Sequence, residues 1–262
     1  IMGIINVTPD SFYDGGKYID PKLAVDQAGR LLEQGADILD IGAESSRPGA
    51  TPVSSTEEEE RILPVLELIR RYYPDAIISI DTTRHSLAFK GIEKYHVNLI
   101  NDISAFSGDH EMIGTISKLH FPYVIMHMKG TPSNMQVNPQ YENLIDEIIA
   151  YFSEKVSILK KKGINDIIID PGFGFGKSLD HNYQLLANLS VFQLFELPIL
   201  AGVSRKSMVS KLLNTSAKKS LNGTTALHMV LLAKGANILR VHDVNEAREA
   251  IEVFLETRRY ES

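Results

Sequence analysis

Three polar side chains stand where they could share one binding site. Asp81, Asn101 and Asp170 each follow an apolar run of three or four residues. A carboxylate withdrawn from water needs hydrogen-bond donors to offset its lost hydration. A flat heterocycle with adjacent N–H and NH2 groups offers two parallel donors to one carboxylate, as a guanidinium does. Asn101 adds a donor and an acceptor. The set suits a pterin or guanine edge or, alternatively, a divalent cation held by the two aspartates.

Positive charge gathers after the last two apolar runs. These segments read Ser-Arg-Lys-Ser at 204–207 and Arg-Val-His-Asp at 240–243. Side chains alternate along a strand, so Arg240 and His242 face the same way if the strand continues. Barrels built from strand–helix units commonly bind phosphate after their last two strands. The two segments therefore predict a phosphate or diphosphate ligand, whereas Arg205 fits a surface ion pair better.

The glycine-rich segment 170–178 resembles a phosphate-binding loop but fails the required spacing. A P-loop needs glycine where Pro171 stands, and the dinucleotide fingerprint needs glycine where Lys177 stands. We instead predict a glycine-rich rim that brings Phe173 and Phe175 close to a ligand. The alternative is a connecting loop with no ligand role.

Two further segments, 8–16 and 44–49, are rich in turn-forming residues and poor in apolar ones. Both follow apolar runs, so both are candidates for mobile lids over a site. The alternative is that their Pro-Gly and Gly-Gly pairs simply form turns.

Short apolar runs alternate with amphipathic stretches, which predicts strands alternating with helices. The near-continuous apolar character of the runs is typical of a parallel sheet covered on both faces. Eight units predict an α/β fold, a single (β/α)8 TIM barrel over residues 1–262, with its site at the C-terminal ends of the strands. An open doubly wound sheet is the alternative. The runs are residues 2–5, 38–41, 77–80, 97–100, 123–126, 167–169, 199–203 and 238–239.

Helix boundaries are also marked in the sequence. Gly35, Gly163 and Gly235 each stand just before an apolar run, where a helix should end. Thr56 precedes four glutamates, which predicts a helix start with acidic residues in its first turn.

Composition excludes several classes of protein. The net charge is −6, which argues against a nucleic-acid or anionic-membrane surface. The absence of cysteine excludes disulfides, thiolate catalysis and iron–sulfur clusters. No apolar stretch is long enough to cross a membrane, and no secretory signal opens the chain. We expect a cytoplasmic protein with a segment missing before Ile1, because a strand-like run begins at once.

Together these motifs resemble one enzyme family, the dihydropteroate synthases. The resemblance runs from the first residue to Val244 and rests on segments in the family's order. These are residues 3–12, 40–49, 79–82, 101–104, 126–128, 170–177, 204–207 and 240–243.

The resemblance implies an activity and its participants. The family joins 7,8-dihydropterin-6-ylmethyl diphosphate to p-aminobenzoate, by SN1-like loss of diphosphate, to give 7,8-dihydropteroate for folate biosynthesis. It further implies Mg2+, a homodimer and sensitivity to sulfonamides.

The resemblance also assigns residues. Asp81, Asn101, Met126, Asp170 and Lys206 would hold the pterin, and Asn6, Arg47, Arg240 and His242 the diphosphate. Asn6 would ligate Mg2+. Phe12, Ser46, Pro48, Phe175, Lys206 and Ser207 would line the p-aminobenzoate pocket. Arg47, Lys206, Asp81 and Asp170 would serve catalysis.

Three alternatives share the pterin site. A pterin-binding methyltransferase domain has no diphosphate to release, and Arg240 with His242 and the Ser-Arg-Pro-Gly segment at 46–49 count against it. A catalytically weak paralogue and a pterin-binding protein without activity are the others. Intact Asn6, Arg47 and Arg240 argue against a non-enzymatic protein.

Overall fold

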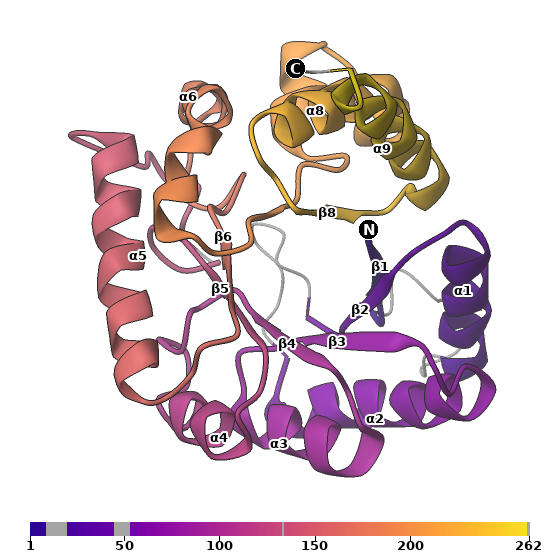
Figure 1. Cartoon of the computed structure of the whole chain (residues 1–262). Helices are drawn as coiled ribbons and strands as arrows, with labels where there is room; N and C mark the ends of the chain where they lie inside the picture. Colours follow the sequence, from indigo (N-terminus) through magenta and orange to yellow (C-terminus); the bar gives the residue numbers. More distant parts are fainter. Residues whose placement is uncertain (9–19, 45–52, 133, 261–262) are drawn as a thin grey trace.

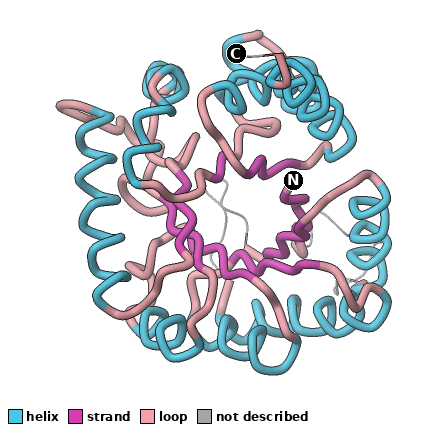
Figure 2. Tube along the Cα trace, viewed as in Figure 1, coloured by secondary structure: helices cyan, strands magenta, loops and turns pink. Residues whose placement is uncertain are grey.

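The computed structural model shows a ring of parallel strands surrounded by helices (Figures 1 and 2). It describes residues 1–8, 20–44, 53–132 and 134–260. The strands are β1 Met2–Asn6, β2 Ile38–Gly42, β3 Ile77–Asp81, β4 Leu99–Asp102, β5 Tyr123–Met126, β6 Ile167–Asp170, β7 Leu200–Ala201 and β8 Ile238–Val241. This alternation of eight strands with helices confirms the predicted TIM barrel and rules out the open doubly wound sheet.

The sheet order is β6-β5-β4-β3-β2-β1-β8-β7, and every neighbouring pair is parallel. An isolated bridge between Ile169 and Ile199 joins the two edges. The run 199–203 contributes only the two residues of β7 to the regular sheet. The regular strand ends at Ala201, and the chain turns at Ser204 and Arg205, where Arg205 has a positive φ of 55°.

Helices form the outer layer in Figure 2. They are α1 Pro21–Glu33, α2 Ser55–Tyr72, α3 His85–Tyr95, α4 Glu111–Leu119, α5 Leu144–Lys161, α6 Leu179–Ala187, α7 Ser207–Leu212, α8 Leu221–Ala233 and α9 Val244–Arg258. Two 3-10 segments, η1 Leu189–Phe195 and η2 Ala217–Lys219, accompany them. No helix in the described part of the chain is long and apolar enough to cross a membrane.

The predicted helix ends are confirmed at three glycines. Gly35, Gly163 and Gly235 have φ values of 93°, 78° and 94°, in the left-handed region that glycine enters without steric cost. The predicted start of α2 is wrong by two residues. Ser54, rather than Thr56, caps the helix by accepting a hydrogen bond from the backbone N–H of Glu57 at 3.2 Å.

A small apolar cluster fills the barrel axis below the C-terminal strand ends. Its buried members come from four strands, and three half-buried isoleucines pack against them. Because side chains alternate along a strand, the residue two positions further on each strand faces the same interior. The cluster contains Met2, Leu99, Val124 and Leu200, with Ile38, Ile168 and Ile238 beside them.

His228 on α8 is the clearest departure from an apolar core. Its side chain is 1% exposed, and neither ring nitrogen has a hydrogen-bond partner among the described residues. Burial lowers its pKa from 6.5 to about 4, and the Asp243 carboxylate offsets part of this. His228 is therefore neutral in the folded protein at pH values where it is protonated in the unfolded chain.

We predict that His228→Leu changes the pH dependence of stability. In the unfolded chain His228 is protonated below about pH 6.5, whereas in the folded protein it is protonated only below about pH 4. Protonation therefore favours the unfolded chain, and the folded protein loses stability as the pH falls through this range. The variant should gain about 2 kcal/mol over wild type between pH 8 and pH 5. Urea unfolding at both pH values measures this gain, and a difference independent of pH would contradict it.

Candidate active site

The polar layer of the barrel lies two residues beyond the apolar cluster. Each of its four side chains stands two positions after a residue of the apolar cluster on the same strand. The pairs are Ile38 and Asp40, Leu99 and Asn101, Ile168 and Asp170, and Ile238 and Arg240. Alternation therefore turns these four side chains into the barrel above an apolar floor. Asp81 on β3 has room beside Gly42, because a Cβ at Gly42 would lie 3.2 Å from the Cβ of Asp81.

Arg240 ties three strands together inside this layer. Its Nε donates to Asp40 Oδ2 at 2.6 Å, and its Nη2 donates to Asp81 Oδ2 at 2.8 Å. Asn101 Nδ2 donates to the same Asp40 oxygen at 3.1 Å. The structure thus places Asp81 and Asn101 in one layer, as predicted, joins both to Arg240, which the sequence predicts separately as a phosphate ligand, and adds Asp40. Asp40 was not predicted as a site residue, although a charged residue within a buried apolar run is itself a signal.

The charges in this layer shift one another's protonation. Burial raises the pKa of Asp81 to about 7, although the guanidinium of Arg240 acts in the opposite sense. Burial would lower the pKa of Arg240, but the Asp40 and Asp81 carboxylates outweigh it and hold that pKa above its ordinary value. Arg240 therefore stays charged, and its guanidinium opposes the rise in the pKa of Asp81.

Asp170 and Lys206 form the other side of the layer. Asp170 Oδ1 accepts the backbone N–H of Gly172 at 2.8 Å. Lys206 Nζ donates to the Phe173 carbonyl at 2.6 Å and lies 4.8 Å from the centre of the Phe175 ring. Burial lowers the pKa of Lys206 to about 8, and the Asp170 carboxylate offsets part of that shift. This arrangement presents a cation and a carboxylate beside an aromatic face.

The glycine-rich segment is held by a buried lysine. Lys177 Nζ contacts His127 Nδ1 at 2.9 Å and donates to the carbonyls of Gly172 at 2.9 Å and Phe175 at 3.0 Å. Gly172 is required, because its φ is 73° and a Cβ would lie 1.9 Å from the His127 carbonyl. Lys177 is therefore a structural clamp that fixes this segment.

The prediction that both Phe173 and Phe175 approach a ligand is wrong for Phe173. Its side chain is fully buried in the main core, because the loop turns its ring outward from the barrel and only its carbonyl meets Lys206. Phe175 instead joins Met126 and Met135 in a separate apolar cluster. This cluster can form a wall for a flat ring.

The condition under which Arg240 and His242 would face the same way, a strand that continues to His242, is not met. Strand β8 ends at Val241, and the His242 ring contacts Ser204 Oγ through Nδ1 at 3.1 Å. The surface ion pair predicted for Arg205 is confirmed, with its Nε donating to Asp243 Oδ2 at 2.8 Å.

The remaining predicted residues are placed only in part. Asn6 ends β1, paired in register with Gly42, and Ser207 begins α7 as an exposed residue. Phe12, Ser46, Arg47 and Pro48 lie outside the described residues.

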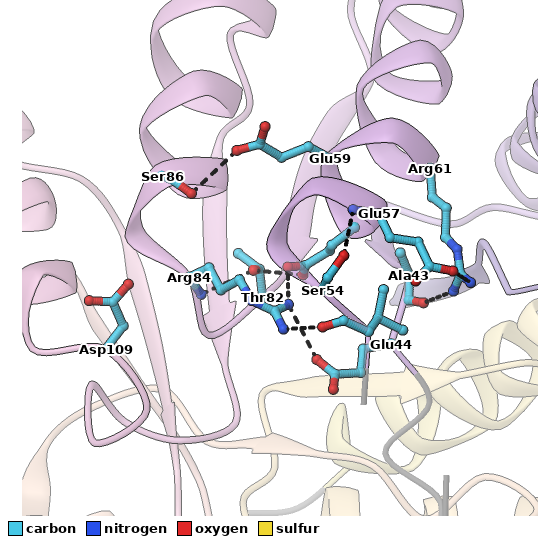
Figure 3. A network of polar contacts seen from close by, with 12 residues as sticks. Ala43, Glu44, Ser54, Glu57, Glu59, Arg61, Thr82, Arg84, Ser86 and Asp109 are labelled. Carbon is cyan, nitrogen blue, oxygen red and sulfur yellow. Dashed lines mark hydrogen bonds and ion pairs between the residues drawn. The ribbon is translucent and has the colours of Figure 1, made fainter. Parts of the chain in front are cut away.

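A polar network holds the chain on both sides of residues 45–52 (Figure 3). Arg84 contacts the buried Glu58 carboxylate and the Val53 carbonyl, and its Nη1 lies 3.5 Å from Glu44 Oε2. Thr82 donates to Glu58 Oε1 at 2.8 Å. One guanidinium therefore bridges the residues at which the chain enters and leaves this segment.

Comparison with known proteins agrees with this geometry. Residues 2–242 match the family described as pterin binding enzyme. Dihydropteroate synthase from Escherichia coli K12 is 41% identical, across 100% of this chain and 94% of its own length. A Yersinia pestis dihydropteroate synthase solved with a sulfonamide drug has a TM-score of 0.92 at 43% identity, covering 98% and 94% of the two chains. A Xanthomonas albilineans dihydropteroate synthase solved with 4-aminobenzoic acid has a TM-score of 0.91 at 36% identity, covering 99% and 93%.

The chain therefore belongs to the pterin-binding enzyme family of TIM barrels. Within that family its full-length similarity is to dihydropteroate synthases, and the activity of this protein is that of a dihydropteroate synthase, a transferase.

The network around Arg84 leads to a stability prediction. Arg84→Met leaves Glu58, which is 1% exposed, as a buried carboxylate without its cation. The loss should be about 2–4 kcal/mol in the free energy of unfolding, slightly below the usual cost because Arg84 is partly exposed. The double variant Arg84→Met/Glu58→Gln removes both charges and should recover most of it. Urea unfolding of the two variants tests this, and equal losses would contradict it.

Proposed function

We propose that the polar layer around Arg240 binds the dihydropterin and orients its diphosphate as the leaving group. The observation that carries this proposal is the convergence of Asp81, Asn101 and Arg240 on one buried hydrogen-bonded network, with Lys206 and Asp170 beside it. The carboxylates of Asp81 and Asp170 face this lumen and suit a ligand edge that supplies N–H groups.

Pterin recognition follows from the donors and acceptors in this layer. Asp170 accepts paired N–H groups of the pterin, and Asn101 and Asp81 meet its remaining polar edge. Lys206 donates to a pterin acceptor. Met126 packs against the ring, and with Phe175 it belongs to the apolar cluster at the mouth of the barrel. Such a site stabilises positive charge that develops on the pterin methylene carbon.

The diphosphate is bound by Arg240, His242 and Arg47. Departure of diphosphate breaks the bond between the methylene carbon and oxygen, and the positive charge left behind is shared with the pterin ring. The amine nitrogen of p-aminobenzoate then forms the C–N bond and loses one proton. Phe12, Ser46, Pro48, Phe175, Lys206 and Ser207 bind p-aminobenzoate next to that carbon, and excluding water protects the cation.

Mg2+ fits the donor set at the end of β1. Among the described residues, no cluster of three or more His, Asp or Glu side chains is suited to a metal. Mg2+ commonly keeps several waters and binds substrate phosphates with one or two protein oxygens, which the amide oxygen of Asn6 matches. When bound, the ion neutralises part of the charge on the leaving diphosphate.

We also propose that the enzyme acts as a cytoplasmic homodimer.

The direct test mixes purified protein with 7,8-dihydropterin-6-ylmethyl diphosphate, Mg2+ and p-aminobenzoate. Dihydropteroate and diphosphate should appear in equal amounts. Pterin binding without release of diphosphate would identify a pterin-binding protein with no synthase activity and overturn the proposal.

Asp170 provides a residue-level prediction. Asp170→Asn replaces one acceptor by a donor and leaves buried N–H groups of the pterin unmatched. The loss should be roughly 2–4 kcal/mol in binding of a hydroxymethyl dihydropterin without phosphates. Calorimetry measures it, with Asp166→Asn as control, because Asp166 is exposed just before the same strand. Near wild-type affinity in Asp170→Asn would exclude this role.

A further inference from the structure

We propose that Asp40 is a positioning residue for the transferase reaction, acting through Arg240 and Asn101. This inference rests on the proposed roles of those two residues in binding the diphosphate and the pterin. Asp40 lies in the middle of β2 and its side chain is fully buried. It therefore contacts the reacting groups only through its neighbours.

One oxygen of Asp40 serves two residues from different sides of the barrel. Oδ2 accepts from Arg240 Nε on β8 and from Asn101 Nδ2 on β4. Strand β1 separates β2 from β8, and β3 separates β2 from β4. The Asp40 carboxylate therefore fixes, relative to each other, two side chains that the sheet ladder does not pair.

The contact determines which groups remain for a ligand. Asn101 donates one side-chain N–H to Asp40, so its carbonyl oxygen and its second N–H stay available for a ligand. Arg240 has five N–H groups, and the bonds to Asp40 and Asp81 use two of them. Three N–H groups remain in a fixed plane, a geometry suited to a diphosphate.

Stability alone does not explain a carboxylate at this position. Asp40 Oδ1 is buried and has no hydrogen-bond partner among the described residues. An unsatisfied buried polar atom costs free energy, and well-packed apolar residues often replace buried ion pairs without loss. Departures from local packing rules of this kind are typical of functional sites.

The test is a double-mutant cycle on the intact enzyme. Asp40→Asn removes the charge with little change of shape, and kcat/KM for the pterin diphosphate should fall roughly 10- to 100-fold, the usual effect of misplacing a binding group. The KM for p-aminobenzoate should stay near wild type. In an Arg240→Ala background the same change should have a clearly smaller effect, because the route through Arg240 is gone and only the contact with Asn101 remains. Arg240→Lys serves as the background if Arg240→Ala does not fold.

Asp102→Asn is the matched control. Asp102 is also fully buried on β4, but it follows Asn101 and bonds to Ser104 and Tyr123 on the other face of the sheet. It should show no coupling to Arg240. Wild-type activity in Asp40→Asn, an equal loss in both backgrounds, or loss of the folded state would each overturn the proposal. Failure of the proposed function would appear separately, as a wild-type enzyme that releases no diphosphate.

Discussion

The ion pair of Arg240 with two carboxylates is the interaction on which the site depends. Asp40, Asp81 and Asp170 face Arg240 and Lys206, so among these five side chains the lumen holds three acids and two bases. These five side chains hold one more acid than base, but burial is the main reason why the pKa of Asp81 rises to about 7, followed by the carboxylates of Asp40, Glu58 and Asp102. A ligand that brings N–H donors relieves that excess. The paired N–H groups along a pterin edge are donors of this kind.

The barrel provides this layer with its dielectric environment. Met2, Leu99, Val124 and Leu200 close the axis directly below, so the charges cannot be hydrated from that side. Fixed dipoles and charges in such surroundings stabilise a developing cation more strongly than water would, because they need not reorganise. The two-residue offset between floor and polar layer follows from strand alternation alone, which makes the fold the direct cause of the site.

The sequence allowed prediction of residues that end apolar runs and failed for residues whose roles depend on packing. Asp81, Asn101 and Asp170 are predictable because a polar residue ending a parallel strand lies at the end of the barrel that carries the site. Asp40 was missed because it lies inside its run, where its partners come from strands far away in sequence. Phe173 was misplaced because the ring direction depends on loop torsions that residue types do not specify.

Two lysines of the site show that residue type and sequence position also do not determine the chemical role of a side chain. Lys177 stands in a segment that resembles a phosphate loop, yet it meets His127 and two loop carbonyls, which matches the three donors of an ammonium. Lys206 makes one described hydrogen bond, to Phe173, and keeps donors for a ligand. Burial lowers the pKa of both, to about 7 and about 8, so perturbation alone does not identify the functional residue. The functional lysine is identified instead by its number of N–H donors without a described protein partner, because only such donors can bind substrate.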